Sequence, residues 1–107
     1  MKTPLSGALL ACLVFGATAP AQAEPQDLMN KAGCLACHHK EKKLVGPALS
    51  TVAARYKGQG PDVATALMQK VRTGSKGVYG PIPMPPSAPD KISDADLKTA
   101  IDWILTL

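Results

Sequence analysis

Two closely spaced cysteines followed by a histidine constrain this chain more than any other feature. The run is Cys34-Leu35-Ala36-Cys37-His38. A disulfide bond between cysteines only three positions apart closes a very small loop, so it would add little stabilisation through chain entropy. The third cysteine, Cys12, lies in a segment that we expect to be removed. The interior of the domain therefore has to be filled by something other than a disulfide bond.

The N-terminal segment has the three parts of a secretory signal peptide. Lys2 supplies the positive charge, Leu5 to Thr18 is predominantly apolar, and Ala21-Gln22-Ala23 offers small residues at a cleavage site. The apolar run is too short for a convincing membrane span, and no second one follows. We expect residues 1–23 to be cleaved and residues 24–107 to form one exported, soluble domain of 84 residues.

A lipoprotein signal is the alternative interpretation of this segment, because Leu9-Leu10-Ala11 precedes Cys12. It would leave the apolar run Leu13-Val14-Phe15 exposed at the new N-terminus. It would also shorten the preceding apolar run to about seven residues, the low end for such a signal. We therefore favour the secretory signal peptide.

The expected mature domain is a poor core former. Its aromatic residues are Tyr56, Tyr79 and Trp103. Domains of this size usually need a disulfide bond, a metal or a cofactor to fold stably.

The charges of the mature domain are unevenly distributed. Loss of Lys2 lowers the formal net charge from +4 to +3. Most cations come early in the chain, whereas Asp90, Asp94, Asp96 and Asp102 come late. This pattern fits either an ordinary solvated surface or a basic face that attracts an acidic partner. Nucleic acid is a poor candidate, because the chain is exported and its few aromatics are not interleaved with basic residues.

The cysteine motif predicts covalent attachment of haem. C-x-x-C-H in an exported chain is the signature of c-type haem, whose two vinyl groups form thioethers with Cys34 and Cys37 while His38 faces the iron. A thioredoxin-like site would need a βαβ setting, and the sequence shows no strand pattern. A structural zinc site would need four ligands, and Cys34, Cys37, His38 and His39 are too contiguous to surround one ion.

The sixth iron ligand is expected to be Met84. His39 is the only other histidine, and its side chain should point away from that of His38. Met29 is too near the attachment site to reach the opposite face of the haem, and Met68 lies on a helical apolar stripe typical of a core residue. Met84 stands in the run Pro81-Ile82-Pro83-Met84-Pro85-Pro86, whose prolines restrict the chain. A thioether ligand favours ferrous iron and raises the reduction potential.

Proline, glycine and serine positions predict short helices and no strands. One should begin at Pro25 and continue toward Cys34, and the break at Gly46-Pro47 precedes another over Ala48 to Tyr56. Further helices are expected from Pro61-Asp62 to Gly74, with Val63, Leu67 and Val71 on one face, and from Ser93, which forms a capping box with Asp96. Leu97, Ile101, Ile104 and Leu105 form the apolar face of this last helix.

The segment from Gly74 to Lys91 cannot form a regular helix or central strand, because it carries five prolines. A disordered linker is one interpretation. We prefer a stiff, ordered loop that presents a single side chain, because the segment joins two helices of a small domain and contains apolar residues such as Val78 and Ile82.

These motifs together resemble a class I cytochrome c. The resemblance rests on Cys34–His38, on Gly46-Pro47 and on the run from Gly74 to Pro86, and it covers essentially the whole mature chain. It is to the short bacterial form of roughly eighty residues, since the proline-rich methionine loop at this distance from His38 is typical of that subgroup. The resemblance implies an all-α fold of four to five short helices wrapped around one covalently bound haem.

The resemblance also implies roles for residues around the iron ligands. Pro47 would offer its carbonyl to the free ring nitrogen of His38. Tyr79 stands where the family commonly has a tryptophan beside a haem propionate, a role that the phenol can also fill. Thr73 stands in place of an asparagine that lies near the methionine sulfur in relatives. The hydrogen bond to Met84 is thus an open point.

The function implied is that of a soluble periplasmic one-electron carrier and not an enzyme, most simply a monomer. A membrane cytochrome complex would be the donor, and nitrite reductase, cytochrome c peroxidase or a terminal oxidase the acceptor. Lys31, Arg55 and Lys57 are the cations expected around the exposed haem edge. Two alternatives stay open, namely a haem enzyme or gas sensor with a free sixth site, and a thiol–disulfide protein. Ligand binding to the reduced protein would favour the first, and absence of covalent haem the second.

Overall fold

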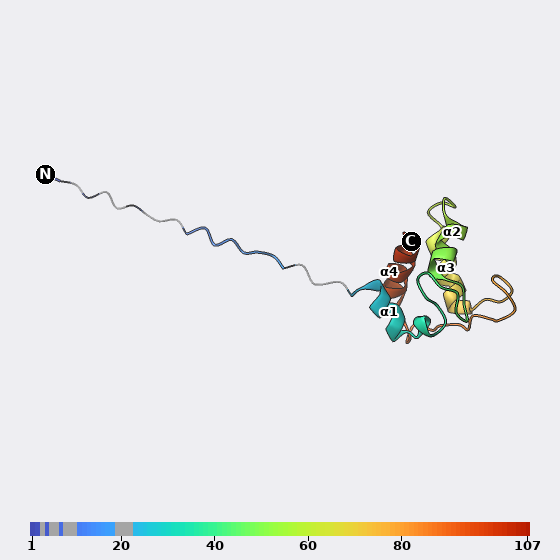
Figure 1. Cartoon of the computed structure of the whole chain (residues 1–107). Coiled ribbons are helices and arrows are strands. Elements are labelled where there is room, and N and C mark those ends of the chain that lie inside the picture. Colours follow the sequence, from blue (N-terminus) through green and yellow to red (C-terminus); the bar gives the residue numbers. More distant parts are fainter. Residues whose placement is uncertain (3, 5–6, 8–10, 19–22) are drawn as a thin grey trace.

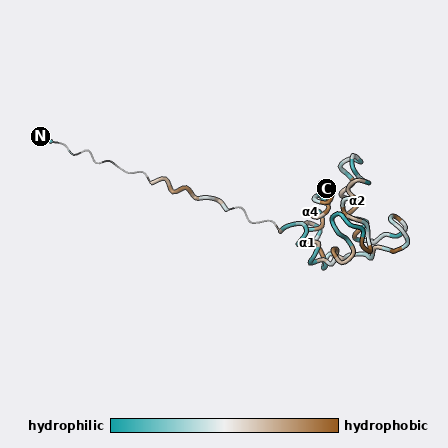
Figure 2. Tube along the Cα trace, viewed as in Figure 1, coloured by the Kyte–Doolittle hydropathy of each residue, from teal (hydrophilic) through white to brown (hydrophobic). Residues whose placement is uncertain are grey.

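The computed structural model describes residues 1–2, 4, 7, 11–18 and 23–107. Residues 11–18 are exposed and lie outside the helical domain (Figure 1). Figure 2 shows that this described stretch of the N-terminal segment is hydrophobic, as a signal peptide requires. Ala21 and Gln22 of the expected cleavage site, and much of the apolar run before it, lie outside the described residues. Cleavage after Ala23 therefore stays a prediction.

The domain is all-α, as predicted from the sequence. Its elements are α1 (Pro25–Lys31), the 3-10 turn η1 (Cys34–Ala36), α2 (Leu49–Tyr56), α3 (Val63–Thr73) and α4 (Asp94–Ile104). In the part of the chain that the structure describes there is no strand, only two isolated bridges, His38 with Lys43 and Ser75 with Met84. None of the described helices is long and apolar enough to cross a membrane.

The helix ends lie at or close to the residues that predicted them. Pro25 is the first residue of α1, where its missing N–H costs no hydrogen bond, and Gly74 directly follows α3. The Ser93 hydroxyl accepts a hydrogen bond from the backbone N–H of Asp96 at 3.1 Å and so caps α4. Helix α1 ends earlier than expected, because Gly33 takes a left-handed conformation (φ +82°) before the cysteine motif.

Helix α4 is the centre of the domain and packs against α1, α2 and α3. The buried core is formed by residues of all four helices and of the loop before α4: Met29, Leu49, Leu67, Ile92, Leu97, Ala100, Ile101 and Ile104. Trp103 is only half-buried against this cluster. Burial of these apolar side chains is the main stabilising contribution of the polypeptide itself.

The proline-rich segment between α3 and α4 is an ordered loop. Ser75 and Met84 exchange both backbone hydrogen bonds, at 3.0 and 2.7 Å, so the chain between them closes on itself. Beyond Met84, the N–H of Ser87 donates to the carbonyl of Val71 in α3 at 2.8 Å. Figure 1 shows the loop beside the end of α3 from which it departs. The ordered alternative is therefore the one that the structure contains.

Candidate haem-binding site

One cavity collects every site residue predicted from the sequence. It has a volume of about 230 Å³, and its walls are mainly apolar side chains from α2, α3, α4 and the proline-rich loop. The predicted residues that line it are Cys34, Cys37, His38, Pro47, Tyr79 and Met84. Residues that are fifty positions apart in the sequence thus line the same cavity.

The ring of His38 is held by its own segment of chain. Its Nδ1 lies 2.8 Å from the carbonyl oxygen of Pro47. Because a carbonyl only accepts hydrogen bonds, Nδ1 carries the proton and Nε2 keeps a free lone pair. The contact expected of Pro47 is therefore present, and it leaves the histidine in the tautomer that can bind a metal through Nε2.

Gly46 allows the chain to pass very close to this ring. A Cβ atom at this position would lie 2.7 Å from Cε1 of His38, which is closer than real Cβ contacts. The Gly46 N–H also donates to the carbonyl of Cys37 at 2.8 Å, and the N–H of His38 donates to that of Cys34 at 3.0 Å. The histidine is thus fixed by short-range turns within residues 34–47.

Met84 is positioned by contacts to a distant part of the chain. It is half-buried, and its backbone pairs with that of Ser75 at the end of α3. Gly74 has a φ of +75°, and a Cβ atom there would lie 2.7 Å from the carbonyl oxygen of Met84. Only glycine combines this left-handed backbone with so close an approach.

The other two methionines of residues 24–107 have environments different from that of Met84. Met29 is 3% exposed and belongs to the core, although its side chain also reaches the cavity wall. Met68 packs against the outside of the core. His39 is exposed, and its Nδ1 accepts hydrogen bonds from the N–H groups of Glu41 and Lys42 at 3.0 and 3.2 Å. His39 is not among the residues that line the cavity.

Both motif cysteines are half-buried free thiols that line the cavity. Burial raises the pKa of the Cys34 thiol. A backbone hydrogen bond offsets this effect only in part, and neighbouring Cys37 adds a smaller increase. Among the described residues, no three His, Cys, Asp or Glu side chains gather as a metal site would require.

The hydroxyl group of Tyr79 is buried and has no hydrogen-bond partner among the described residues. Burial raises its pKa, and this effect is only partly offset by the guanidinium of Arg55. That guanidinium lies 5.0 Å above the Tyr79 ring and donates to the carbonyl of Val78 at 3.2 Å. A buried hydroxyl without a partner is costly, so this one fits a bound group that brings its own acceptor.

The cations at the cavity differ from those expected. Lys31, Arg55 and Lys57 do not line it, and Arg55 instead holds the Tyr79 segment. Three other lysines do, and they are Lys43, Lys70 and Lys76. Lys43 falls between His38 and Pro47, and Lys76 falls in the loop that carries Met84, so proximity in sequence to the two predicted ligands could have indicated both.

Thr73 does not take the role of the asparagine that it was expected to replace. Its hydroxyl lies 3.0 Å from the carbonyl of Gln69, within the last turn of α3, and 3.1 Å from that of Gly74. It is exposed, and no hydrogen bond joins it to Met84 in the described part of the molecule. The sequence left this hydrogen bond open, because a threonine near a helix end can bond either to its own helix or to a neighbour.

These observations fit a haem bound through its two vinyl groups and its iron. Two thiols and an imidazole with a free Nε2 come from one side, a thioether comes from the other segment, and the walls between them are apolar. The partnerless Tyr79 hydroxyl and the half-buried Lys70 are polar groups among these mainly apolar walls.

Comparison with known proteins identifies the family. The sequence profile of the Cytochrome c family matches residues 22–107. Cytochrome c-552 of Nitrosomonas europaea is 50% identical over 100% of this chain and 99% of its own length. Cytochrome c-551 of Pseudomonas denitrificans is 49% identical over 77% of this chain and 95% of its own length.

Solved structures show the same arrangement of helices. The crystal structure of wild-type Nitrosomonas europaea cytochrome c552 superimposes with a TM-score of 0.68 at 51% identity, covering 77% of this chain and 98% of that one. A class 1 cytochrome, MtoD from Sideroxydans lithotrophicus, gives a TM-score of 0.64 at 26% identity. The fold is therefore that of class I cytochromes c. The chain belongs to the cytochrome c family, whose members carry covalently bound haem c and transfer electrons without acting as enzymes.

Proposed function

We propose that this protein is a periplasmic one-electron carrier whose haem iron is held by His38 and Met84. The observation that carries the proposal is the fixed tautomer of His38, whose Nδ1 is bonded to Pro47 while Nε2 is left free beside a cavity that Met84 also lines. When bound, the haem supplies a metal centre that alternates between ferric and ferrous states. If His38 and Met84 both hold the iron, no position on it would be left for a substrate.

The chain's own groups would perform four tasks at this site. Cys34 and Cys37 would form the thioether links, and Pro47 would keep the imidazole of His38 in its binding orientation. Met84 would complete the iron coordination and favour the ferrous state. The hydroxyl group of Tyr79 would donate a hydrogen bond to a haem propionate, and this would give the buried hydroxyl the partner that it lacks.

The division into a leader of residues 1–23 and a domain of residues 24–107 is part of the proposal. The c-551 of Pseudomonas denitrificans matches along nearly its whole length but covers only 77% of this chain. The solved Nitrosomonas europaea domain likewise covers 77%. The remaining N-terminal part has the pattern of a signal peptide, which supports export to the periplasm.

The mouth of the cavity suits a transient encounter with an acidic redox protein. Val45 and Ile82 line it and are 53% and 61% exposed, and the exposed cations Lys43 and Lys76 stand with them. Apolar contact with a rim of one charge favours association that is fast and short-lived. We assign this face to docking of a membrane cytochrome complex as donor and of nitrite reductase, cytochrome c peroxidase or a terminal oxidase as acceptor, with the carrier acting as a monomer.

The optical spectrum of the exported, haem-loaded protein tests the ligand assignment. Ferric haem bound by methionine gives a weak near-infrared band, which we expect in the wild type and expect to vanish in Met84→Ala. The half-buried Met68 provides the matched control, and Met68→Ala should keep the band. A covalent haem without this band in the wild type would show that the sixth position is open or filled by another group.

A further inference from the structure

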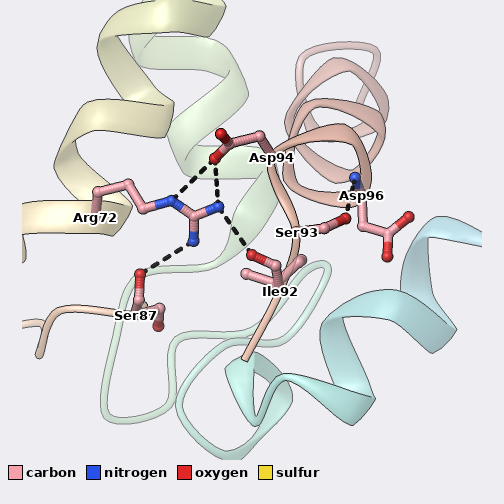
Figure 3. A network of polar contacts seen from close by, with 6 residues as sticks. All are labelled: Arg72, Ser87, Ile92, Ser93, Asp94 and Asp96. Atoms are coloured by element: carbon pink, nitrogen blue, oxygen red, sulfur yellow. Dashed lines mark hydrogen bonds and ion pairs between the residues drawn. The ribbon is translucent and has the colours of Figure 1, made fainter. Parts of the chain in front are cut away.

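Arg72 joins three segments of the domain through one side chain (Figure 3). Its Nη1 donates to the carbonyl of Ser87 at 3.1 Å, and its Nη2 donates to the carbonyl of Ile92 at 2.8 Å. Nη2 and Nε also donate to Oδ1 of Asp94, at 2.6 and 3.3 Å. The side chain of Arg72 is only 18% exposed, although that of Asp94 is 80% exposed.

The three acceptors of Arg72 border the loop that carries Met84. Arg72 lies in the last turn of α3, Ser87 stands three residues after Met84, and Ile92 directly precedes the cap of α4. The N–H of Ser87 donates to Val71 in the same turn of α3. Both backbone polar groups of Ser87 are therefore tied to the end of α3.

The chain between Ser87 and Met84 is short and stiff, so fixing Ser87 also restricts the position of Met84. Only Pro85 and Pro86 separate Met84 from Ser87, and each has a fixed φ angle. On its other side, Met84 is paired with Ser75. Release of Ser87 would thus free one of the two points between which the methionine is held.

The geometry of the contact requires an arginine. A planar guanidinium presents several N–H groups in fixed directions and serves carbonyl and carboxylate acceptors together. A lysine ammonium is a compact charge and cannot reach all three acceptors at once. Hydrogen bonds from a charged donor are also stronger than neutral ones, so the anchor is a firm one.

We propose that Arg72 is a positioning residue for Met84, which it acts on by anchoring the exit of the proline-rich loop, and that it sets how readily the methionine leaves the iron. The proposal rests on the proposed coordination of iron by Met84. Arg72 itself does not line the cavity, so its effect passes through the loop backbone. Loss of the anchor should shift the loop toward conformations in which the sulfur is away from the iron.

Competition by imidazole for the sixth position of the ferric haem-loaded protein measures this directly, because imidazole binds only when Met84 has left. Loss of two carbonyl anchors in Arg72→Met should raise the apparent affinity for imidazole about tenfold. Arg72→Lys should fall between Arg72→Met and the wild type. Asp94→Ala should have the smallest effect of the three, because the carbonyl contacts stay in place and Asp94 is exposed.

The matched control is the second ion pair among the described residues, which lies on the exposed side of α4. It joins Nζ of Lys98 to Oδ2 of Asp102 at 2.5 Å. Lys98→Ala should leave the affinity for imidazole unchanged. If Arg72→Met lowers the unfolding temperature but binds imidazole as weakly as the wild type does, Arg72 has a general structural role and the proposal is wrong.

Two further outcomes are informative. If Arg72→Met does not mature with haem, Arg72→Lys carries the test, and a change below twofold would overturn the proposal. If the wild type lacks the near-infrared methionine band and binds imidazole as tightly as Met84→Ala does, the coordination by Met84 fails and this inference fails with it. A wild type with the band and unchanged Arg72 variants would refute the inference alone.

Discussion

The two proposed iron ligands are held in opposite ways. His38 is fixed by contacts within residues 34–47, in which the cysteine motif, Gly46 and Pro47 form consecutive turns. Met84 is fixed by contacts that reach back to α3 and forward to α4, through Ser75 and Arg72. The contacts of His38 are therefore close in sequence, whereas those that hold Met84 join segments far apart in the chain.

This difference indicates where the properties of the carrier can be adjusted. A local turn closed by covalent links to the cofactor leaves little freedom for variation. A long loop tied at a few points can be loosened or tightened by single substitutions at some distance from the iron. We therefore expect substitutions on the methionine side to change ligand exchange and reduction potential, and those on the histidine side to change stability.

Removal of the methionine ligand should have the largest effect. Met84→Ala is expected to lower the reduction potential by on the order of 0.2 V, a fraction of the roughly 0.8 V that axial ligands span in haem proteins. It should also let cyanide or imidazole bind without denaturant. Potentiometry and ligand titration measure both effects, with Met68→Ala as control. An unchanged potential in Met84→Ala would contradict the assignment.

Two glycines of the same loop form a matched pair that separates backbone strain from crowding. Gly74 and Gly77 have φ values of +75° and +76°, but a Cβ atom would meet Met84 only at Gly74. Gly77→Ala should cost about 1–2 kcal/mol of unfolding free energy for the left-handed backbone. Gly74→Ala should cost about 1–3 kcal/mol more for overpacking, and should also strengthen imidazole binding. Equal losses in denaturant unfolding would show that the loop moves aside freely.

Gly46→Ala is the corresponding test on the histidine side. The added Cβ would meet Cε1 of His38 at 2.7 Å, so we expect a loss of about 1–3 kcal/mol in the free energy of unfolding. Because the ring is held by its own segment, we expect the near-infrared methionine band to remain. Loss of that band in Gly46→Ala would mean that the His38 segment and the Met84 loop are coupled and are not held independently.

Removal of the Tyr79 hydroxyl tests its proposed hydrogen bond. In the haem-loaded protein, Tyr79→Phe should lower the free energy of unfolding by about 1–2 kcal/mol. Burial raises the pKa of Tyr79, so its protonated form stabilises the folded state below the usual tyrosine pKa of about 10, and this contribution is lost as the pH rises above it. Wild-type stability should therefore fall more steeply than that of Tyr79→Phe above about pH 10. Parallel pH profiles and equal stabilities would refute the hydrogen bond.

The smallest effects are expected from the lysines at the cavity mouth. Here the histidine segment and the methionine loop should contribute equally to the rate of electron transfer. Lys43 belongs to the histidine segment and Lys76 to the methionine loop, and both are exposed. Lys43→Glu and Lys76→Glu should each slow electron transfer to an acidic partner a few-fold at low salt, and the difference should vanish above about 0.5 M salt, where charges are screened. Stopped-flow rates measure this, with Lys98→Glu on α4 as control. Rates that do not depend on salt would remove the basic docking face.

The local features were predictable from the sequence and the long-range ones were not. Pro25, Gly74 and Ser93 marked helix ends because their backbone preferences act locally. The cysteine motif and the prolines around Met84 indicated the site for the same reason.

The contacts of Arg55 and Arg72 could not be foreseen. Each arginine contacts a carbonyl group at least fifteen positions away. The sequence alone does not distinguish such an arginine from one that only faces solvent. The lysines around the cavity were misjudged because their location depends on the fold of two loops. The described contacts of Thr73 became clear only from the direction of its hydroxyl.

The inner face of α4 contributes both to the buried core and to the wall of the cavity. Leu97, Ala100, Ile101 and Ile104 form the buried core and also line the cavity. The polypeptide thus has no hydrophobic interior that is complete apart from its cofactor. Enlarging the pocket for a larger macrocycle would require the removal of side chains that also hold the helices together. The same substitution would therefore admit a new cofactor and destabilise the fold. An engineer would need to strengthen the contacts of α1 with α4 first, before altering the wall.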